Sequence, residues 1–317
     1  MEKNNIFLKS EVSFANLNTL SQKQADGFEL RICEFSFIAD EILSSAKKLA
    51  DDGMSITEIL SLLSEELGIT AAAVPENAMP QSRSSIKGFL SNLNTLDKVS
   101  LCNLITEKWR GLGRPLSETD FLASESAEPT FAYVKNSLSD EAYEVFSQEF
   151  DDPRVSYCQS FKEACHAVAE SDVGYCILPL EEKGGARIPG IASMISSFDL
   201  KIVAVTPVFG FEGNADVKYA LLSRGFFVPE RLPDDDLYLE IVLYQDSDVG
   251  ISELLSVAES LGIGVYRINT VLYESDGTQP AFSVVLRDDG ADFTPLLVFL
   301  TLFSSSYSSV GFYKNLE

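Results

Sequence analysis

The chain has 317 residues, 45% of them hydrophobic and 23% charged, which fits a globular protein of roughly two or three domains. Its 48 acidic and 24 basic residues give a net charge of −24 and a pI near 4.3. Such a charge repels phosphate backbones and anionic lipid surfaces unless cations are concentrated locally, and the sequence contains no basic run. We therefore expect neither nucleic acid nor a membrane surface as a partner.

The lack of a recognisable targeting segment and the cysteine pattern lead us to expect a cytoplasmic protein. Met1–Asn5 is polar and leads into no apolar stretch of signal-peptide length. The most apolar segment, Phe293–Phe303, is too short to span a bilayer. The only histidine is His166, which excludes a His-based triad or zinc cluster. The cysteines are odd in number and form no CxxC pair, which favours reduced thiols over a disulfide framework or a zinc site: Cys33, Cys102, Cys158, Cys165 and Cys176. We expect neither a metal nor a cofactor.

The first third of the chain, residues 1–122, is predicted to be an all-helical domain. Apolar residues recur at helical spacing between Phe35 and Leu49, and a capping box at Ser55–Glu58 opens a second helix. A third amphipathic stretch runs from Ile86 to Trp109. The acidic, Ser-rich segment Ser117–Pro129 has the composition of a linker.

Strands and helices alternate in the next segment, residues 129–234, which predicts an α/β lobe with a mostly parallel sheet. A helix is expected to begin at Ser139, and a second at the capping box Ser160–Glu163. The expected strands are Phe131–Val134, Val155–Tyr157, Val173–Pro179 and Leu200–Val208.

The last segment, residues 237–317, follows the order βαββαβ, which is the ferredoxin-like plan. Gly250 precedes the first helix, and Gly262 and Gly264 follow it, as expected for turns at helix ends. The expected elements are strand Leu237–Tyr244, helix Ile251–Leu261, strands Val265–Tyr273 and Ala281–Leu286, helix Phe293–Phe303, and strand Ser309–Tyr313.

Three stretches resemble the prephenate dehydratase family. Phe161–Glu181 is similar to the family's helix and following strand, which ends in P-I-E-N-S, and Phe198–Val205 is similar to a later strand. Val310–Tyr313 matches the closing L-G-x-Y of the family's ACT domain, which the βαββαβ segment resembles. The resemblance covers roughly residues 130–317 and implies a role in aromatic amino-acid metabolism, specifically that of phenylalanine.

The sequence departs from the family at its catalytic positions. The family's T-R-F triplet, whose Thr assists departure of the hydroxyl and whose Arg binds a carboxylate, aligns with Val217, Lys218 and Tyr219. Val217 cannot donate a proton, and positioned proton transfer contributes roughly 10²–10⁴-fold in rate. The family also inserts a second lobe before this triplet, whereas here Thr206 and Val217 are too close in sequence to hold one. The resemblance therefore implies a single lobe without a closed cleft.

Two groups of candidate binding residues follow from the resemblance. Glu181 and Lys183 correspond to residues that border the family's cleft, and Lys218 corresponds to the Arg of its triplet. Lys183, Arg187 and Lys218 either gather around an anion where the family's cleft lies or merely offset local acidity. Two family motifs that bind phenylalanine in the ACT domain have drifted, and their counterparts predict an effector site of altered specificity. Its residues are Gly250, Ile251, Ser252, Asn269 and Thr270.

Three functional hypotheses remain open from the sequence. The first is a degenerate, regulatory or amino-acid-sensing relative of prephenate dehydratase that forms a homodimer, since the Phe-rich segment Phe293–Phe303 offers apolar surface to bury. The second is an active prephenate dehydratase, which converts prephenate to phenylpyruvate with loss of water and CO2. The third is a scaffold that binds a protein partner through its helical domain. The expected ligand is an amino acid or a prephenate-like molecule.

Overall fold

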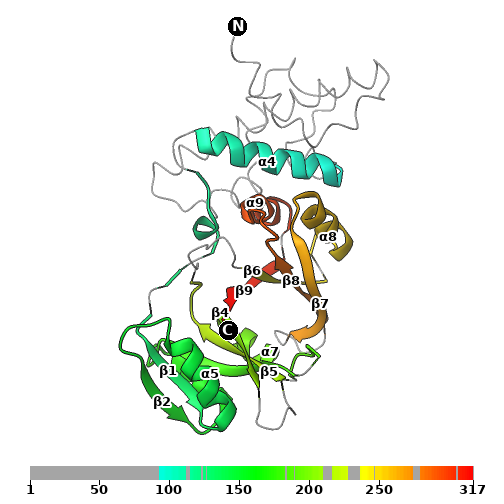
Figure 1. Ribbon diagram of the computed structural model, residues 1–317. Coiled ribbons are helices and arrows are strands. Elements are labelled where there is room, and N and C mark those ends of the chain that lie inside the picture. The colour runs from blue at the N-terminus through cyan, green and yellow to red at the C-terminus, as the bar shows by residue number, and fades with distance from the viewer. Residues whose placement is uncertain are drawn as a thin grey trace, which may run out of the picture.

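A nine-stranded mixed sheet organises the part of the chain that the computed structural model describes (Figure 1). The described residues are 93–111, 115–122, 124–125, 127–182, 184–188, 190–209, 216–227, 236–245, 247–273, 279–304 and 306–316. The helices predicted between Phe35 and Gly68, and the start of the third amphipathic stretch, lie outside these ranges.

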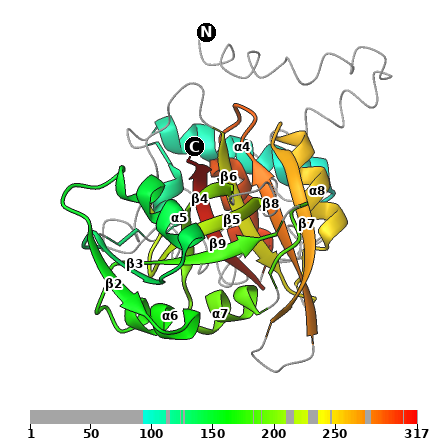
Figure 2. The same cartoon turned by 60° about the horizontal axis from the view of Figure 1, so that its bottom comes forward.

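The strands lie in the order β2-β1-β3-β5-β4-β9-β6-β8-β7 (Figure 2). Their bounds are β1 Thr130–Val134, β2 Arg154–Cys158, β3 Tyr175–Glu181, β4 Lys201–Phe209, β5 Asp216–Ser223, β6 Leu237–Leu243, β7 Gly264–Tyr273, β8 Gln279–Arg287 and β9 Tyr307–Asn315. The described helices are α4 Thr95–Gly111, the 3-10 turn η4 Glu118–Asp120, α5 Ser137–Ser147, α6 Phe161–Ala169, α7 Ile191–Ser197, α8 Ile251–Ser260 and α9 Thr294–Phe303.

The α/β lobe is confirmed, but the prediction of a mostly parallel sheet is wrong for its second half. Strand β1 pairs in parallel with β2 and β3, whereas β3 pairs antiparallel with β5, and β5 with β4. Residues 210–215, which connect β4 to β5, are too few for the crossover that a parallel pair requires. The same six residues leave no room for a lobe between β4 and β5, and the degenerate, single-lobe organisation stays a prediction.

Helix starts in the lobe follow from local side-chain chemistry. The Ser160 hydroxyl accepts a hydrogen bond from the Glu163 amide at 3.1 Å, which is the N-cap half of the predicted capping box. The Glu163 carboxylate accepts from the Gln159 amide at 2.7 Å. Helix α5 begins at Ser137, two residues earlier than expected, because the Asn136 side chain caps it and Ser139 bonds back to the Asn136 amide at 3.1 Å. Ser139 is therefore the third residue of the helix.

The predicted ferredoxin-like βαββαβ order is confirmed by β6, α8, β7, β8, α9 and β9. These strands form the antiparallel order β9-β6-β8-β7, and their apolar face packs beneath α8 and α9.

Strand β9 joins this unit to the lobe. It pairs in parallel with β4, with Ile202 opposite Gly311 and Val205 opposite Asn315, so both units share one continuous sheet. A Cβ atom at Gly311 would lie 2.9 Å from the Ile202 Cβ, which explains the glycine at this contact. The division at residues 234–237 into two domains stays a prediction.

Helix α4 lies across α9 and α8 (Figure 1). Leu101 and Ile105 of α4 are fully buried in the same core as Phe299 of α9, and Lys98 forms a 2.7 Å ion pair with Glu253 of α8. The apolar surface of α9 is therefore covered within one chain. This surface is not available for a contact between two copies, and the homodimer stays a prediction.

The segment predicted as a linker is packed against the protein. Leu116 and Leu122 are buried in the core beneath α4, and η4 lies between them. Ser124 forms a parallel bridge with Phe226. Phe121 and Ala127 also pack against the cores. The acidic, Ser-rich composition gave no indication of this packing, because the inward-facing residues are few and widely spaced.

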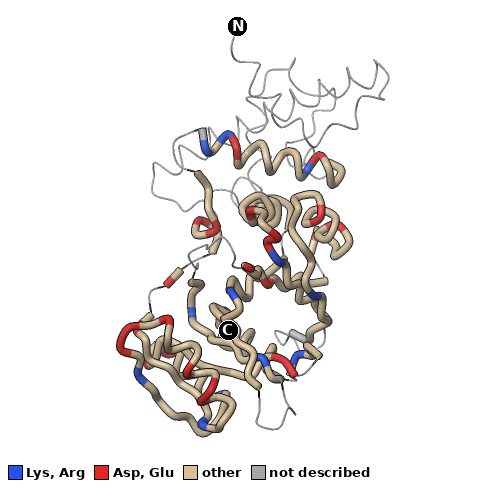
Figure 3. Tube along the Cα trace, viewed as in Figure 1, with Lys and Arg blue, Asp and Glu red and all other residues tan. Residues whose placement is uncertain are grey.

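Charged residues are dispersed along the described trace. Acidic residues mark α5 and the neighbouring turns, and Lys and Arg are scattered rather than gathered in one run (Figure 3). None of the described helices is long and apolar enough to cross a membrane.

Candidate functional site

The end of β3 gathers the candidate substrate residues. Glu181, the last residue of β3, lies opposite Lys218 of β5 and forms an isolated bridge with Arg187 in the following loop. The loop turns back through Gly184 and Gly185, whose φ angles of 92° and 82° favour glycine. The structure therefore brings together Glu181, Arg187 and Lys218, while Lys183 lies outside the described residues.

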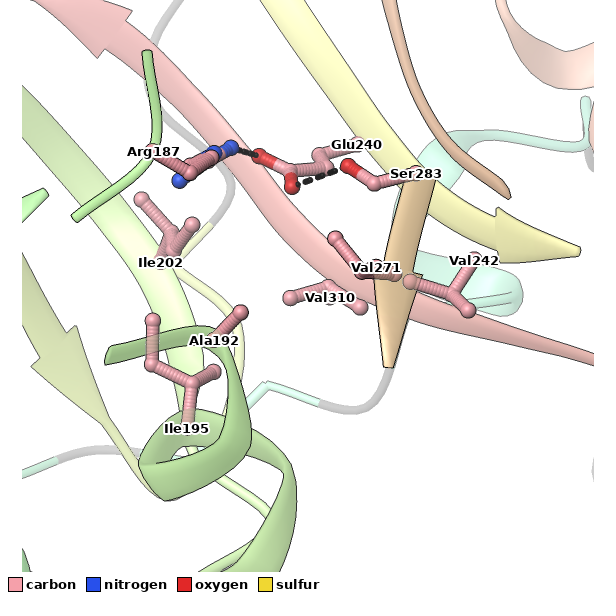
Figure 4. A pocket seen from close by; sticks show the side chains of 9 residues that line it. All are labelled: Arg187, Ala192, Ile195, Ile202, Glu240, Val242, Val271, Ser283 and Val310. Carbon is pink, nitrogen blue, oxygen red and sulfur yellow. Dashed lines mark hydrogen bonds and ion pairs between the residues drawn. The ribbon is translucent and has the colours of Figure 1, made fainter. Parts of the chain in front are cut away.

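A buried network of charges links this loop to the C-terminal unit (Figure 4). Arg187 donates a short hydrogen bond to Glu240 of β6, and its Nε lies 3.7 Å from Glu181 Oε1. Arg267 of β7 approaches the same Glu181 oxygen at 2.6 Å, and Ser283 of β8 donates to Glu240 at 2.8 Å. The side chains of Arg187, Glu181 and Glu240 are only 11%, 6% and 4% exposed.

Neighbouring acidic groups keep the Arg187 guanidinium of this network positively charged. Burial alone would lower the pKa of the Arg187 guanidinium, but Glu240, Tyr313 and Glu181 together outweigh burial and raise that pKa. Tyr313, whose hydroxyl lies 3.5 Å from Glu240, has its pKa raised well above 10, mainly by burial and then by Glu240. The network therefore contains a permanent cation and a neutral phenol.

Two buried polar atoms in this region have no hydrogen-bond partner among the described residues. They are the acceptor Glu181 Oε2 and the donor Asn269 Nδ2. Asn269 lies on β7 opposite Ser283 of β8, so both side chains project from the same face of the sheet. Leaving such atoms unsatisfied costs about 1–3 kcal/mol each, which makes them informative about a missing partner.

The network borders a small cavity between α7 and the C-terminal sheet (Figure 4). Arg187, Glu240 and Ser283 lie on one side of it, and aliphatic side chains form the rest of its wall. The cavity volume of about 10 Å³ corresponds to about one water molecule.

The three residues aligned with the family triplet, Val217, Lys218 and Tyr219, do not all direct their side chains to one face of the sheet. Lys218 reaches the Tyr266 hydroxyl at 3.5 Å and lies 5.6 Å from the centre of that ring. Val217 and Tyr219 pack instead in the core around Phe131. Successive residues of a strand face opposite sides of the sheet, so the Lys218 ammonium group and the Val217 side chain lie on different faces.

The predicted effector residues are likewise divided between two faces. Gly250 is the N-cap of α8, and Ile251 packs in the core beneath that helix, whereas Ser252 is exposed. Asn269 faces the other side of the sheet with the charge network, and Thr270 alternates away from it. The structure therefore does not bring Asn269 into one pocket with Gly250–Ser252.

Four contributors to the site were not predicted from the sequence: Glu240, Arg267, Ser283 and Tyr313. Of these, Glu240 could have been recognised as unusual, because it is the only charged residue in the buried strand Leu237–Leu243. A charge in a strand that is buried throughout requires a buried partner, and only the fold identifies that partner as Arg187.

A second depression, of about 250 Å³, lies at the opposite end of β3. It is bordered by Glu125, Ser171 and Arg224, and Arg224 forms a 3.3 Å ion pair with Glu125. Among the residues with described positions, no group of three or more His, Cys, Asp or Glu side chains is arranged to hold a metal ion.

No protein-family description and no curated protein matches the sequence. Among solved structures, the chain is similar to GqqA, a quorum-quenching acylase, with 18% identity, a TM-score of 0.44, and coverage of 59% of this chain and 95% of that chain. It is similar to the Streptococcus mutans prephenate dehydratase, with 14% identity, a TM-score of 0.44, and coverage of 59% and 98%.

A further similar structure is the Arthrobacter aurescens prephenate dehydratase in complex with L-Phe. It shares 13% identity and a TM-score of 0.44, and the match covers 58% of this chain and 89% of that chain. At these identities and scores the similarities decide nothing about function, which has to be argued from the site itself.

Proposed function

We propose that this chain is a regulatory, amino-acid-sensing protein of aromatic amino-acid metabolism, related to prephenate dehydratase but without dehydratase chemistry. The observation that carries the proposal is the state of Arg187. This cation of the candidate cleft is buried and already paired with Glu240 and Glu181, beside a cavity of about 10 Å³. Among the described residues, the cavity beside Arg187 is too small for a prephenate dianion, and the Arg187 guanidinium is already paired.

The site lacks the proton donor that would assist departure of the hydroxyl group from prephenate. Val217 has no hydroxyl, and its side chain packs in the core around Phe131. Lys218 is held near the Tyr266 ring, and its ammonium group lacks the bidentate geometry with which arginine binds a carboxylate. Loss of positioned proton transfer alone costs roughly 10²–10⁴-fold in rate.

The fold around the site supports the same conclusion. Strands β4 and β5 pair directly, with Thr206 opposite Tyr219 and Val208 opposite Val217. Only residues 210–215 connect the two strands, so no lobe is inserted between them. Without an inserted lobe, the chain lacks the interlobe cleft in which a preorganised, water-excluding environment would form.

We further propose that the βαββαβ unit is an ACT-like sensing domain that pairs with a second copy of the chain. Strand β7 is the outer strand of the sheet on this side, and its Val265, Tyr266 and Ile268 are each 42% exposed. An edge strand with exposed apolar side chains is suited to pairing with another strand. The free thiols of Cys102, Cys158, Cys165 and Cys176 support a cytoplasmic location.

An assay of the full chain with prephenate tests the loss of catalysis. In the active-enzyme alternative, Lys183, Arg187 and Lys218 hold the carboxylates and phenylpyruvate accumulates. The proposal predicts no phenylpyruvate above the spontaneous rate. Turnover of about 1 s⁻¹ or more, which is ordinary for enzymes, contradicts it.

Thermal unfolding with phenylalanine, tyrosine, tryptophan and prephenate tests the sensing role. A ligand that binds only the folded state raises the melting temperature in proportion to the logarithm of its concentration. The proposal predicts such a rise for an amino acid. A chain that responds to no amino acid, and instead binds a protein partner through the region preceding α4, fits the scaffold hypothesis.

A further inference from the structure

Three of the four described cysteines lie in the interface between α6 and the sheet of the lobe. Cys158 ends β2, Cys165 is on α6, and Cys176 is the second residue of β3. The register places Cys176 beside Ala132 of β1, and both side chains are buried in the core that also contains Cys165. Cys158 packs against the same core. These thiols take no part in the network around Arg187.

Cys165 is the central member of this cluster. Strand β1 lies between β2 and β3, so Cys158 and Cys176 are separated by two strand spacings, roughly 10 Å. A disulfide joins Cα atoms that are at most about 7 Å apart, so these two residues cannot bond to each other directly. Helix α6 packs over all three strands, and its Cys165 side chain is fully buried against them. A bond between the cluster's thiols therefore has to include Cys165.

The three thiols differ in exposure and in acidity. Among the described cysteines only Cys158 is partly exposed, since Cys102, Cys165 and Cys176 are fully buried. A hydrogen bond with Cys176 lowers the pKa of Cys165, whereas burial raises the pKa of Cys176 and of Cys158. Because the thiolate is the nucleophile, Cys165 is the best nucleophile of the cluster, while Cys158 is the thiol that a solute reaches.

We propose that Cys158, Cys165 and Cys176 form a redox modification site, in which a peroxide oxidises Cys158 and the oxidation passes through Cys165 to a Cys165–Cys176 disulfide. The site fits the cytoplasmic location proposed above, because disulfides in reducing compartments are usually transient and either redox-sensing or catalytic. The inference goes beyond the proposed amino-acid sensing and does not depend on it.

The peroxide supplies the two-electron oxidation that the disulfide requires. The Cys158 thiolate attacks one peroxide oxygen and becomes a sulfenic acid, while the O–O bond breaks and the other oxygen takes up a proton and leaves as water or an alcohol. The Cys165 thiolate attacks the oxidised sulfur, so a Cys158–Cys165 disulfide forms and the hydroxyl leaves with a proton as water. Cys176 then attacks the Cys165 sulfur, and Cys158 leaves as a thiol with the proton that Cys176 lost.

Thiol mapping of the natural full chain tests the proposed site. The reduced protein is treated with hydrogen peroxide, alkylated with N-ethylmaleimide under denaturing conditions, digested and mapped by mass spectrometry. We expect a Cys165–Cys176 disulfide that dithiothreitol reverses, while Cys102 stays open to alkylation. If Cys165 and Cys176 both remain alkylated, whether or not Cys158 becomes a sulfinic acid, the proposal is overturned.

Variants of the full chain, each checked for folding by circular dichroism, test the order of transfer. Cys176→Ala removes the last thiol, so the Cys158–Cys165 disulfide should accumulate. Cys158→Ser removes the thiol that solutes reach, so Cys165–Cys176 should form about tenfold more slowly or less readily still. Cys102→Ala is the matched control, because it changes a buried cysteine of α4 outside the cluster, and it should leave the rate unchanged. A Cys158→Ser variant that oxidises at the natural rate, or a Cys176→Ala variant that forms no disulfide, overturns the relay.

Discussion

Arg187 and Glu240, 53 residues apart in sequence, form a buried ion pair that ties the loop after β3 to the first strand of the C-terminal unit. Because Arg187 is paired with Glu240, its guanidinium group is not available to bind an anionic substrate. It also places opposite charges beside a cavity at the junction of the two units. The proposed loss of catalysis depends on this contact.

Removing one member of the pair is predicted to be strongly destabilising. Arg187→Ala leaves Glu240 buried without its cation and should lower the free energy of unfolding by about 3–5 kcal/mol. Urea denaturation monitored by circular dichroism measures the change. Arg224→Ala is the matched control, because its ion pair with Glu125 is 46% and 51% exposed, and it should change stability by about 1 kcal/mol or less. Equal effects of the two substitutions contradict a buried network.

Helix α4 is predicted to belong to the core of the C-terminal unit. Leu101→Ala removes a fully buried side chain facing α9 and should lower the free energy of unfolding by about 2–5 kcal/mol. Leu96→Ala is made on the same helix at a side chain that is 68% exposed, so it should have little effect. Similar urea midpoints for both variants would show that α4 does not pack as described.

The parallel junction between β4 and β9 is predicted to require a glycine. Gly311→Ala places a methyl group 2.9 Å from the Ile202 Cβ and should lower the free energy of unfolding by about 1–3 kcal/mol. Gly250→Ala serves as the control, because nothing lies within 4 Å of the added atom and φ is an ordinary −75°. Chemical denaturation of both variants makes the comparison, and a tolerated Gly311→Ala argues against the contact.

Stability is predicted to fall in alkaline solution partly through Tyr313. Burial and Glu240 raise the pKa of Tyr313 well above 10, whereas the pKa of an unfolded tyrosine is about 10. Above that pH the unfolded chain binds fewer protons than the folded protein, so stability is complete below pH 10 and declines as pH rises. Tyr313→Phe should flatten this decline by up to about 1.4 kcal/mol per pH unit. Urea midpoints between pH 8 and 11 measure it, and an unchanged slope contradicts the assignment.

Much of the fold could be predicted because its signals are local. The capping box at Ser160 predicted the start of α6, and the alternation of strand and helix patterns predicted the βαββαβ order. Strand pairing is not local, so the antiparallel arrangement of β3, β5 and β4 and the joining of β4 to β9 could not be read from the same patterns.

The site was predictable only on its lobe side. Glu181 lies opposite Lys218 in the sheet and forms a bridge with Arg187, while the binding role of these residues stays a prediction. Their partners Glu240 and Arg267 come from strands whose position relative to the lobe depends on the β4–β9 pairing. No local pattern predicts that contact.

Incubation of the purified full chain with prephenate, with phenylpyruvate measured over time, tests the central claim most directly. The account predicts formation at the spontaneous rate, for the natural chain and equally for the double variant Val217→Thr with Lys218→Arg, because Arg187 stays paired with Glu240 in both. Formation at about 1 s⁻¹ or faster by the natural chain would contradict it.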